Sequence, residues 1–167
     1  MKADEYKKNM EQLERIELSV VEISKLFRTG RCELPDYGIL TIENTSEVVR
    51  VLSSLYSITC VFWGRFRVEA ERAETRRKHQ ESVLYMTVKK ELLKVPEAGK
   101  RGDGKLTQRD IESAVAEKCT PLIDTEIMYD RLFIKASACK EALDKCLWSI
   151  DSITRIRSLE LKAASAS

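Results

Sequence analysis

The chain has few of the sequence features that are typical of small disulfide-rich proteins, of zinc-binding domains or of membrane-spanning proteins. Its 167 residues include only three prolines and six glycines, a composition that favours long helices over many short strands. The five cysteines are an odd number and contain no Cys-x-x-Cys pair, so neither a disulfide framework nor a zinc knuckle is expected. The first ten residues lack an apolar leader, and the longest apolar stretch, 58–63, is too short to span a bilayer. These features predict a reducing compartment, the cytoplasm.

Catalytic clusters are also scarce. The single histidine, His79, lies among arginines, so no nucleophile–base pair can be assigned. Asp124, Glu126 and Asp130 fall at the expected start of the last helix, where carboxylates suit the positive end of the helix dipole. We therefore expect a protein without enzymatic activity, cofactor or metal. The alternative is a metal-dependent nuclease that uses Asp103, Asp124 or Asp130.

What the chain does have is positive charge concentrated in one segment. Residues 65–109 hold 13 Lys and Arg against 7 Asp and Glu, whereas the whole chain has 29 against 27. A face of this kind is typical of proteins that bind polyanions. The other interpretation is a solvated helix of mixed charge, because glutamates at 69, 71 and 74 alternate with the arginines. The candidate nucleic-acid-binding residues are Arg65, Arg67, Arg72, Arg76, Arg77, Lys78, Lys89, Lys90, Lys94, Lys100, Arg101 and Lys105.

Apolar spacing predicts an all-α protein of long helices. The first helix should cover 4–28, and a second should begin near residue 45, with Asn44 among the candidate caps, and continue to about 94. Residues 30–45 form a connector in which 38–42 could be a short strand, although no second strand is evident to pair with it. Only the first half of the second helix has an apolar stripe, so its second half should project or line a surface.

The last third of the chain predicts a coiled-coil-like assembly helix. Thr107 and Asp110 resemble a cap that opens a short helix to about 118, and Pro121 should restart the chain into a helix over 122–161. Apolar residues there follow 3-4 spacing for about four heptads, which is typical of a self-associating seam. The candidate oligomerisation residues are Tyr129, Leu132, Leu143, Cys146, Ile150 and Ile153.

The predicted organisation has four consecutive parts. These are an N-terminal helical region (1–60), a basic helix with a glycine-rich loop (61–106), a C-terminal oligomerisation region (107–161) and a disordered tail (162–167).

The loop Gly99-Lys-Arg-Gly-Asp-Gly104-Lys105 nearly matches the nucleotide-binding loop G-x-x-x-x-G-K-[ST]. Leu106 stands where that loop needs a hydroxyl for magnesium, and no buried strand precedes it, so we exclude an ATP site. Glycines let backbone N–H groups approach phosphates closely, and the lysines and arginine supply charge, which indicates a phosphate contact. A basic surface turn without a ligand is an equally weighted interpretation.

Aromatic side chains near the basic tract are candidates for stacking on the bases of a single strand. Phe62, Trp63 and Phe66 lie at helical spacing in an apolar stretch and are expected in the core instead. Tyr85 lies nearer the basic tract and is the better stacking candidate.

The order of features from the basic helix onward resembles the UvsY family of phage recombination mediators. In that family, a Lys/Arg-rich helix leads into a glycine-rich RGDG loop, a short polar helix, and a VDT-x-x-x-Y helix start with an aliphatic heptad-like tail. This chain has Arg101-Gly-Asp-Gly104 as the loop and Ile123-Asp124-Thr125-Glu-Ile-Met-Tyr129 as the helix start. Its tail contains Leu143, Leu147, Ile150, Ile153 and Ile156, and the resemblance covers about residues 65–157.

This resemblance implies a DNA-binding protein of recombination and repair. It implies a ring-like homo-oligomer that binds single-stranded DNA through the basic helix and loop and assembles through its C-terminal helix. It also implies two protein partners, a RecA-like recombinase and the single-strand-binding protein that the recombinase replaces. The residues that correspond in position to the family's basic residues are Lys89, Lys90, Lys94, Lys100 and Arg101. The alternatives are a coiled-coil scaffold or adaptor without nucleic-acid function, and a polymerase regulator that acts through the acidic remainder of the chain.

Overall fold

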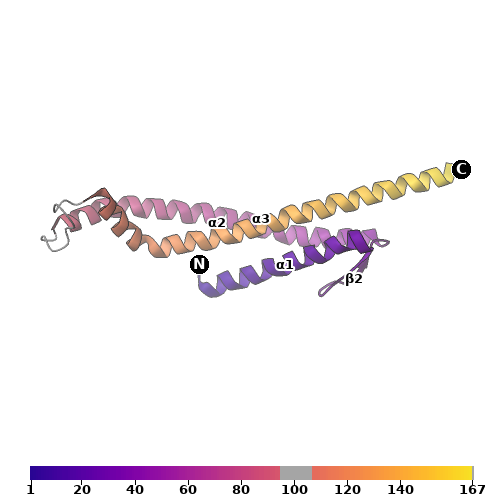
Figure 1. Ribbon diagram of the computed structural model, residues 1–167, viewed down its shortest axis with the longest axis horizontal. Helices are drawn as coiled ribbons and strands as arrows, with labels where there is room; N and C mark the ends of the chain where they lie inside the picture. The colour runs from indigo at the N-terminus through magenta and orange to yellow at the C-terminus, as the bar shows by residue number, and fades with distance from the viewer. Residues whose placement is uncertain (95–106, 167) are drawn as a thin grey trace. The chain divides into compact units, whose positions relative to one another are not determined.

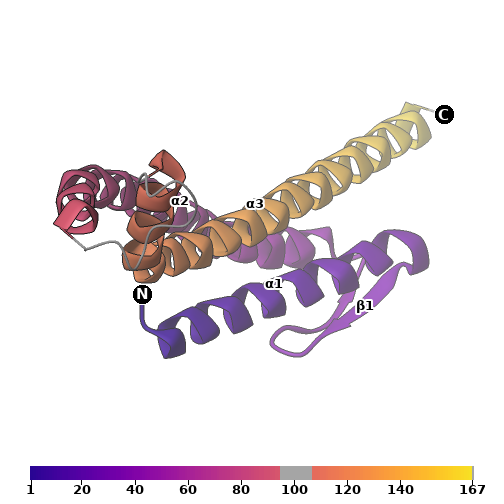
Figure 2. The same cartoon turned by 60° about the vertical axis from the view of Figure 1, so that its left-hand side comes forward.

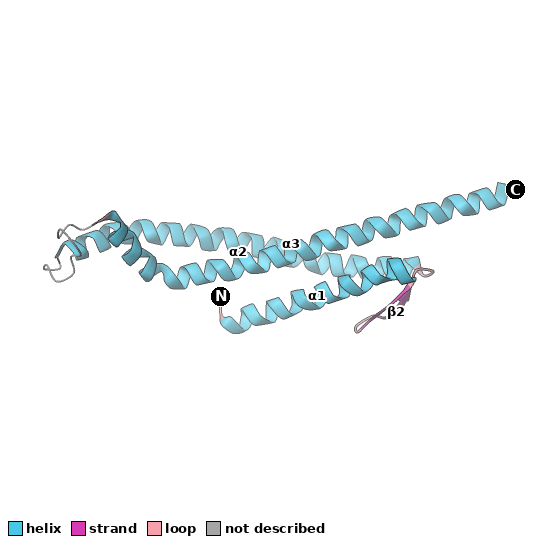
Figure 3. Cartoon of the chain, viewed as in Figure 1, coloured by secondary structure: helices cyan, strands magenta, loops and turns pink. Residues whose placement is uncertain are grey.

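The computed structural model describes residues 1–94 and 107–166, which are almost entirely helical (Figure 3). The helices are α1 (Ala3–Thr29), α2 (Thr45–Lys94) and α3 (Gln108–Ala166), and the strands are β1 (Arg31–Leu34) and β2 (Gly38–Thr41) (Figure 1). The predicted all-α class is therefore confirmed. None of the described helices combines the length and the apolar character that a bilayer-spanning segment needs.

The chain divides into two compact units. Unit 1 comprises Met1–Phe66 and Leu132–Ser167, and unit 2 comprises Arg67–Arg131. The units are not consecutive segments of sequence, because α2 and α3 each contribute residues to both.

The helix ends lie close to where their capping residues predict them. Gly30 ends α1 in the left-handed conformation, with φ of 76°, and its N–H donates to the carbonyl of Leu26 at 2.8 Å. At the start of α2, Asn44 Oδ1 accepts a hydrogen bond from the N–H of Glu47 at 3.4 Å. The cap predicted for α3 is confirmed. The N–H of Thr107 donates to Asp110 Oδ2 at 3.0 Å, and the N–H of Asp110 donates to Thr107 Oγ1 at 3.3 Å.

The connector between α1 and α2 is a β-hairpin, so the expectation that 38–42 would lack a partner is wrong. β1 pairs antiparallel with β2, with Arg31 opposite Thr41 and Leu34 opposite Gly38. Cys32 and Leu34 point into the core while their neighbours are exposed. An alternation of only four residues is too short to stand out in a sequence, and this explains why the strand was missed.

Unit 1 is built around a core of large aliphatic side chains. In both Figure 1 and Figure 2, α1 lies alongside the part of α3 that belongs to unit 1. The fully buried side chains of this core include Leu26 from α1, Leu34 and Leu40 from the hairpin, Leu52 from α2 and Leu143 from α3. All the elements of unit 1 therefore exclude water from one core, which is the main stabilising term for such a unit.

Two other features of unit 1 connect its elements. Phe62 stacks on the buried Phe66 with ring centroids 5.6 Å apart, and Trp63 contacts Phe133 of α3 at 6.2 Å. Phe66 is buried in the core, as predicted, whereas Phe62 and Trp63 are half-buried. Arg157, where the apolar register of α3 fails, donates from Nη1 to the carbonyl of Ile42 at 2.9 Å and so ties α3 to the end of the hairpin.

Unit 2 has a core of its own, although a smaller one. Val88 of α2 is buried against Ile111, Val115 and Cys119 of α3, with Tyr85 packed beside them. The expectation that the second half of α2 lacks an apolar face is therefore wrong. The buried side chains on this half include Ala70 and Ala73, which are small, and Val88, so its apolar face is weaker than that of the first half.

The predicted break at Pro121 is also wrong, because α3 runs through it without interruption. Proline has no N–H, so in a helix it leaves the carbonyl four residues earlier without its backbone donor. Here that carbonyl belongs to Glu117, and the hydroxyl of Thr120 donates to it at 2.9 Å. Residues 162–166, predicted as part of a disordered tail, are the last turns of the same helix.

Candidate nucleic-acid interface

Eight of the twelve candidate nucleic-acid-binding residues lie on α2 with described side chains. Arg65 belongs to unit 1, and the other seven, from Arg67 to Lys90, belong to unit 2. Lys94 closes α2, and its side chain lies outside the described residues. Lys100, Arg101 and Lys105 also lie outside them, as does the glycine-rich loop.

Three of the described cations share one exposed face of α2. Arg72, Arg76 and Lys90 are separated by four and fourteen residues, which are close to whole numbers of helical turns. Val88, which is buried, marks the other side of the helix. The basic face predicted from the sequence is therefore solvent-exposed at these three positions. Val83 and Met86, which are 52% and 57% exposed, lie between them on the same side.

Several of the candidate cations already pair with glutamates of their own helix. Arg67 Nε lies 3.1 Å from Glu71 Oε1, and Arg72 Nη1 lies 2.9 Å from Glu69 Oε1. Exposed pairs of this kind stabilise a protein by roughly 0 to 1 kcal/mol. A phosphate can compete for such cations at little cost, so these pairs weaken the basic face without removing it. Lys78 forms the same kind of pair with Glu74, and in unit 1 Arg65 pairs with Glu5 of α1.

Arg77 differs from the other cations because it links α2 to α3 within unit 2. Its Nη1 donates to both carboxylate oxygens of Glu81, at 2.8 and 2.9 Å, and its Nε donates to Glu126. The side chains of Arg77 and Glu126 are only 22% and 16% exposed. The hydrogen bonds that Arg77 donates, first to Glu126 and then to Glu81, raise the pKa of its guanidinium further above the usual range. This geometry gives Arg77 a structural role within unit 2, and its contact with phosphate stays a prediction.

The carboxylates assigned to a helix start are found in the middle of α3. Because α3 begins at Gln108, Asp124, Glu126 and Asp130 are more than three turns from its N-terminus and do not face its positive end. Glu126 serves instead as the partner of Arg77. Burial, followed by the nearby carboxylates of Glu126 and Glu74, raises the pKa of Asp130. Within the described residues, no group of three or more His, Cys, Asp and Glu side chains is placed to hold a metal ion.

The cations best placed to meet a strand are Arg76, Lys89 and Lys90. All three are exposed on the second half of α2, and none of them forms an ion pair with another described residue. Lys89 and Lys90 lie in the last turns of α2, just before the segment that contains the glycine-rich loop in the sequence.

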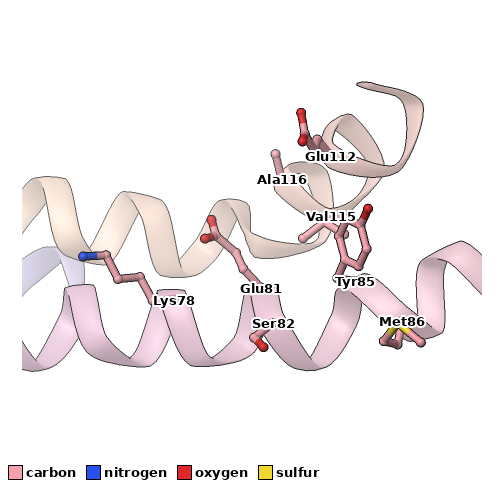
Figure 4. Close-up of a pocket in the computed structure, with 8 residues that line it drawn as sticks. All are labelled: Lys78, Glu81, Ser82, Tyr85, Met86, Glu112, Val115 and Ala116. Carbon is pink, nitrogen blue, oxygen red and sulfur yellow. The ribbon is translucent and has the colours of Figure 1, made fainter. Parts of the chain in front are cut away.

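A groove in unit 2 separates part of α2 from the beginning of α3 (Figure 4). It has a volume of about 590 Å³. The ring of Tyr85 lies beside Val115 at one side, while the carboxylates of Glu81 and Glu112 and the ammonium of Lys78 line the rest (Figure 4). The groove can accept a flat apolar group next to Tyr85, but its two carboxylates oppose the entry of a phosphate.

The predicted oligomerisation seam is buried within the chain. Leu132, Leu143, Cys146 and Ile150 are at most 5% exposed in unit 1, and Tyr129 and Ile153 are half-buried. The thiol of Cys139, on the same stripe, lies 3.7 Å from the carbonyl oxygen of Leu13 in α1. From Leu132 to Ile150 the seam is therefore covered by other elements of unit 1. Self-association through it requires unit 1 to open.

Sequence reasoning missed the Arg77–Glu126 clamp and the groove beside Tyr85. The spacing of Arg77 and Glu81 was a visible signal for an ion pair on one helix, but Glu126 is 49 residues away.

In comparisons with known protein families, with characterised proteins and with solved structures, nothing matches this chain.

Proposed function

We propose that the protein binds single-stranded DNA through exposed cations of α2 and serves as a non-enzymatic recombination mediator. In this role it helps a RecA-like recombinase to replace single-strand-binding protein on the strand. The observation that carries the proposal is the placement of Arg76, Lys89 and Lys90. They are exposed, make no ion pair with another described residue, and precede the basic, glycine-rich segment 99–105.

The chemistry of these exposed cations favours binding without base recognition. Phe62 and Phe66 are packed in unit 1 and Tyr85 is half-buried, so the described part of α2 offers no row of exposed aromatic side chains to bases. Affinity then comes mainly from cations that displace counterions from phosphates, and it should fall steeply as salt is added. Weak sites of this kind become effective when several copies of the protein act on one strand.

The first test is fluorescence anisotropy of a labelled single-stranded oligonucleotide at about 50 and 200 mM salt, a range over which counterion release is steep. The triple variant Arg76→Glu, Lys89→Glu and Lys90→Glu should lose most of the affinity of the wild type. A matched control is Lys7→Glu, Lys8→Glu and Arg28→Glu, which changes the net charge equally at exposed positions of α1. Equal losses in the two variants would mean that only net charge matters, and the proposed face would be wrong.

The mediator role has a separate test. A RecA-like recombinase is added to DNA covered by single-strand-binding protein, and the rate at which it loads is measured with and without this protein. The proposal expects faster loading with the wild type and not with the triple variant of α2. If the wild type binds DNA but leaves the loading rate unchanged, the proposed binding site stands and the proposed mediator role is wrong.

A structural scaffold without nucleic-acid function is the second candidate. It is favoured by the ion pairs that occupy five of the eight described candidate cations, namely Arg65, Arg67, Arg72, Arg77 and Lys78. On this interpretation the charges solvate α2 and hold it to its neighbours. It predicts no salt-sensitive affinity for DNA, so the anisotropy experiment separates the two candidates.

A further inference from the structure

α3 carries a second regular stripe, opposite to its buried seam. The stripe starts two residues after Leu132, which is the first buried residue of the seam. It repeats the same 3-4 spacing as the seam. Its members are Ile134, Ala138, Glu141, Lys145, Trp148, Ser152, Arg155 and Leu159. Two residues correspond to about 200° around a helix, so these side chains face away from the core of unit 1. We call this surface the Trp148 stripe.

The centre of the stripe is a large apolar side chain in contact with water. Trp148 is 73% exposed, and Ile134 and Leu159 near the two ends are 66% and 64% exposed. A tryptophan removes roughly 150 to 250 Å² from water when it is covered, and such residues are enriched among the anchors of protein interfaces. Two exposed aliphatic residues flanking one tryptophan on a helix face are the apolar part of a docking surface.

The charges around Trp148 identify what covers it. Glu141 and Lys145 lie seven and three residues before it, and Asp151 and Arg155 lie three and seven residues after it. If a second α3 lies antiparallel with its own Trp148 opposite, Glu141 faces Arg155 and Lys145 faces Asp151, and two-fold symmetry repeats both pairs. In a parallel arrangement each residue faces its own copy, and all four contacts are between like charges.

These four side chains are available for such contacts. Within one chain Lys145 pairs with Glu141 and Arg155 pairs with Asp151, each at 2.7 Å, but all four side chains are more than half exposed. Exposed pairs on one helix contribute little by themselves and can accept a second partner. On docking, each pair would become half of a four-residue network across the interface.

We propose that a second copy of this chain docks antiparallel on the Trp148 stripe and forms a closed two-fold dimer. The two Trp148 side chains meet at its centre, and Leu159 of each copy lies against Ile134 and Ala138 of the other. The buried seam of unit 1 stays intact, so self-association takes place on the opposite face of α3 from the one predicted. The dimer does not depend on DNA binding, and either proposal can fail without the other.

The first experiment measures the mass of the full chain by light scattering at concentrations from about 1 to 100 µM, where small interfaces dissociate. The wild type should approach twice the chain mass of 19.2 kDa as concentration rises, and Trp148→Ala should remain at 19.2 kDa. The matched control is Val61→Ala, because Val61 is 70% exposed on α2 of the same unit and away from the stripe. This control should keep the mass of the wild type.

The second experiment fixes the orientation. Glu141→Arg and Arg155→Glu should each produce a monomer, because each places like charges opposite one another at both ends of the antiparallel pair. The double variant with both changes restores opposite charges and should recover the dimer. In a parallel arrangement each residue faces its own copy, so none of these changes would alter the charge pairing, and the single variants would keep the mass of the wild type. A wild type that stays monomeric, a Trp148→Ala chain of unchanged mass, or a double variant that remains monomeric would overturn the proposal. All of these positions are exposed, so circular dichroism should show the same helix content throughout.

Discussion

Unit 1 and unit 2 are held together in different ways. The core cluster of unit 1 contains fifteen buried residues from two strands and three helices, whereas the described core cluster of unit 2 contains four from two helices. Unit 2 adds the half-buried clamp of Arg77 with Glu81 and Glu126. The unit with the smaller described core cluster is also the one that carries seven of the eight described candidate cations of α2. We infer that stability is concentrated in unit 1 and that unit 2 opens more readily, as binding regions often do.

The largest expected effect comes from a cavity in unit 1. Leu143 is fully buried, so Leu143→Ala should lower the free energy of unfolding by about 2 to 5 kcal/mol. Urea denaturation monitored by circular dichroism measures the loss. The control is Leu161→Ala near the end of α3, where the side chain is 72% exposed and the change should stay within about 0.5 kcal/mol. Similar losses for the two variants would contradict the assignment of the core.

A smaller effect should follow from breaking the clamp of unit 2. Arg77→Met keeps much of the apolar stem but leaves the carboxylate of Glu126, which is 16% exposed, without its cation. The expected cost is about 1 to 3 kcal/mol, because an unpaired polar group stays partly buried. Hydrogen exchange should quicken in residues 67–92 and 107–131 and stay unchanged in unit 1.

The control for the clamp is Arg72→Met. Arg72 forms an exposed pair with Glu69, so its loss should leave hydrogen exchange in both units nearly unchanged. If Arg77→Met accelerates exchange equally in the two units, they unfold together, and the proposed difference between them is wrong.

The smallest expected effect is a pH dependence within unit 2. Burial and neighbouring carboxylates raise the pKa of Asp130 in the folded protein, so folding favours its protonated form. This group therefore favours the folded state at low pH, and that contribution is lost as pH rises through the raised pKa. At neutral pH Asp130→Asn should stabilise the protein slightly, by less than about 0.5 kcal/mol because the side chain is largely exposed.

The advantage of Asp130→Asn should vanish below the ordinary aspartate pKa of 3.8, where the wild-type carboxyl is protonated in both states. Urea denaturation at several pH values measures it. An advantage that persisted at the lowest pH would show that electrostatics is not its cause.

Local signals in the sequence predicted the helices well. The cap at Thr107 and Asp110 and the terminating Gly30 are short-range chemistry, and the structure places both as expected. The β-hairpin was missed because each strand has only four residues, and the break at Pro121 was wrong because the hydroxyl of Thr120 replaces the missing donor. Hydrogen bonds from a neighbouring side chain can keep a proline within a helix, and proline alone does not reveal them.

The candidate site was harder to predict for a different reason. The 3-4 stripe of α3 was recognised, but periodicity does not say whether its partner is another chain or, as for Leu143, the rest of unit 1. Likewise, the count of cations on α2 was correct, but it could not show that Arg77 is bound by Glu126. Such pairings depend on which distant segments meet. They follow from the tertiary fold and not from the local sequence.

The most direct test of the central claim is the salt dependence of binding to single-stranded DNA. Each phosphate neutralised on a single strand contributes about 0.7 to the slope of log affinity against log salt, so losing three cations should lower the slope by about 2. The account predicts this decrease for the Arg76, Lys89 and Lys90 triple variant and no change for the Lys7, Lys8 and Arg28 variant. An unchanged slope in the first variant, or a wild type that does not bind at low salt, would contradict it.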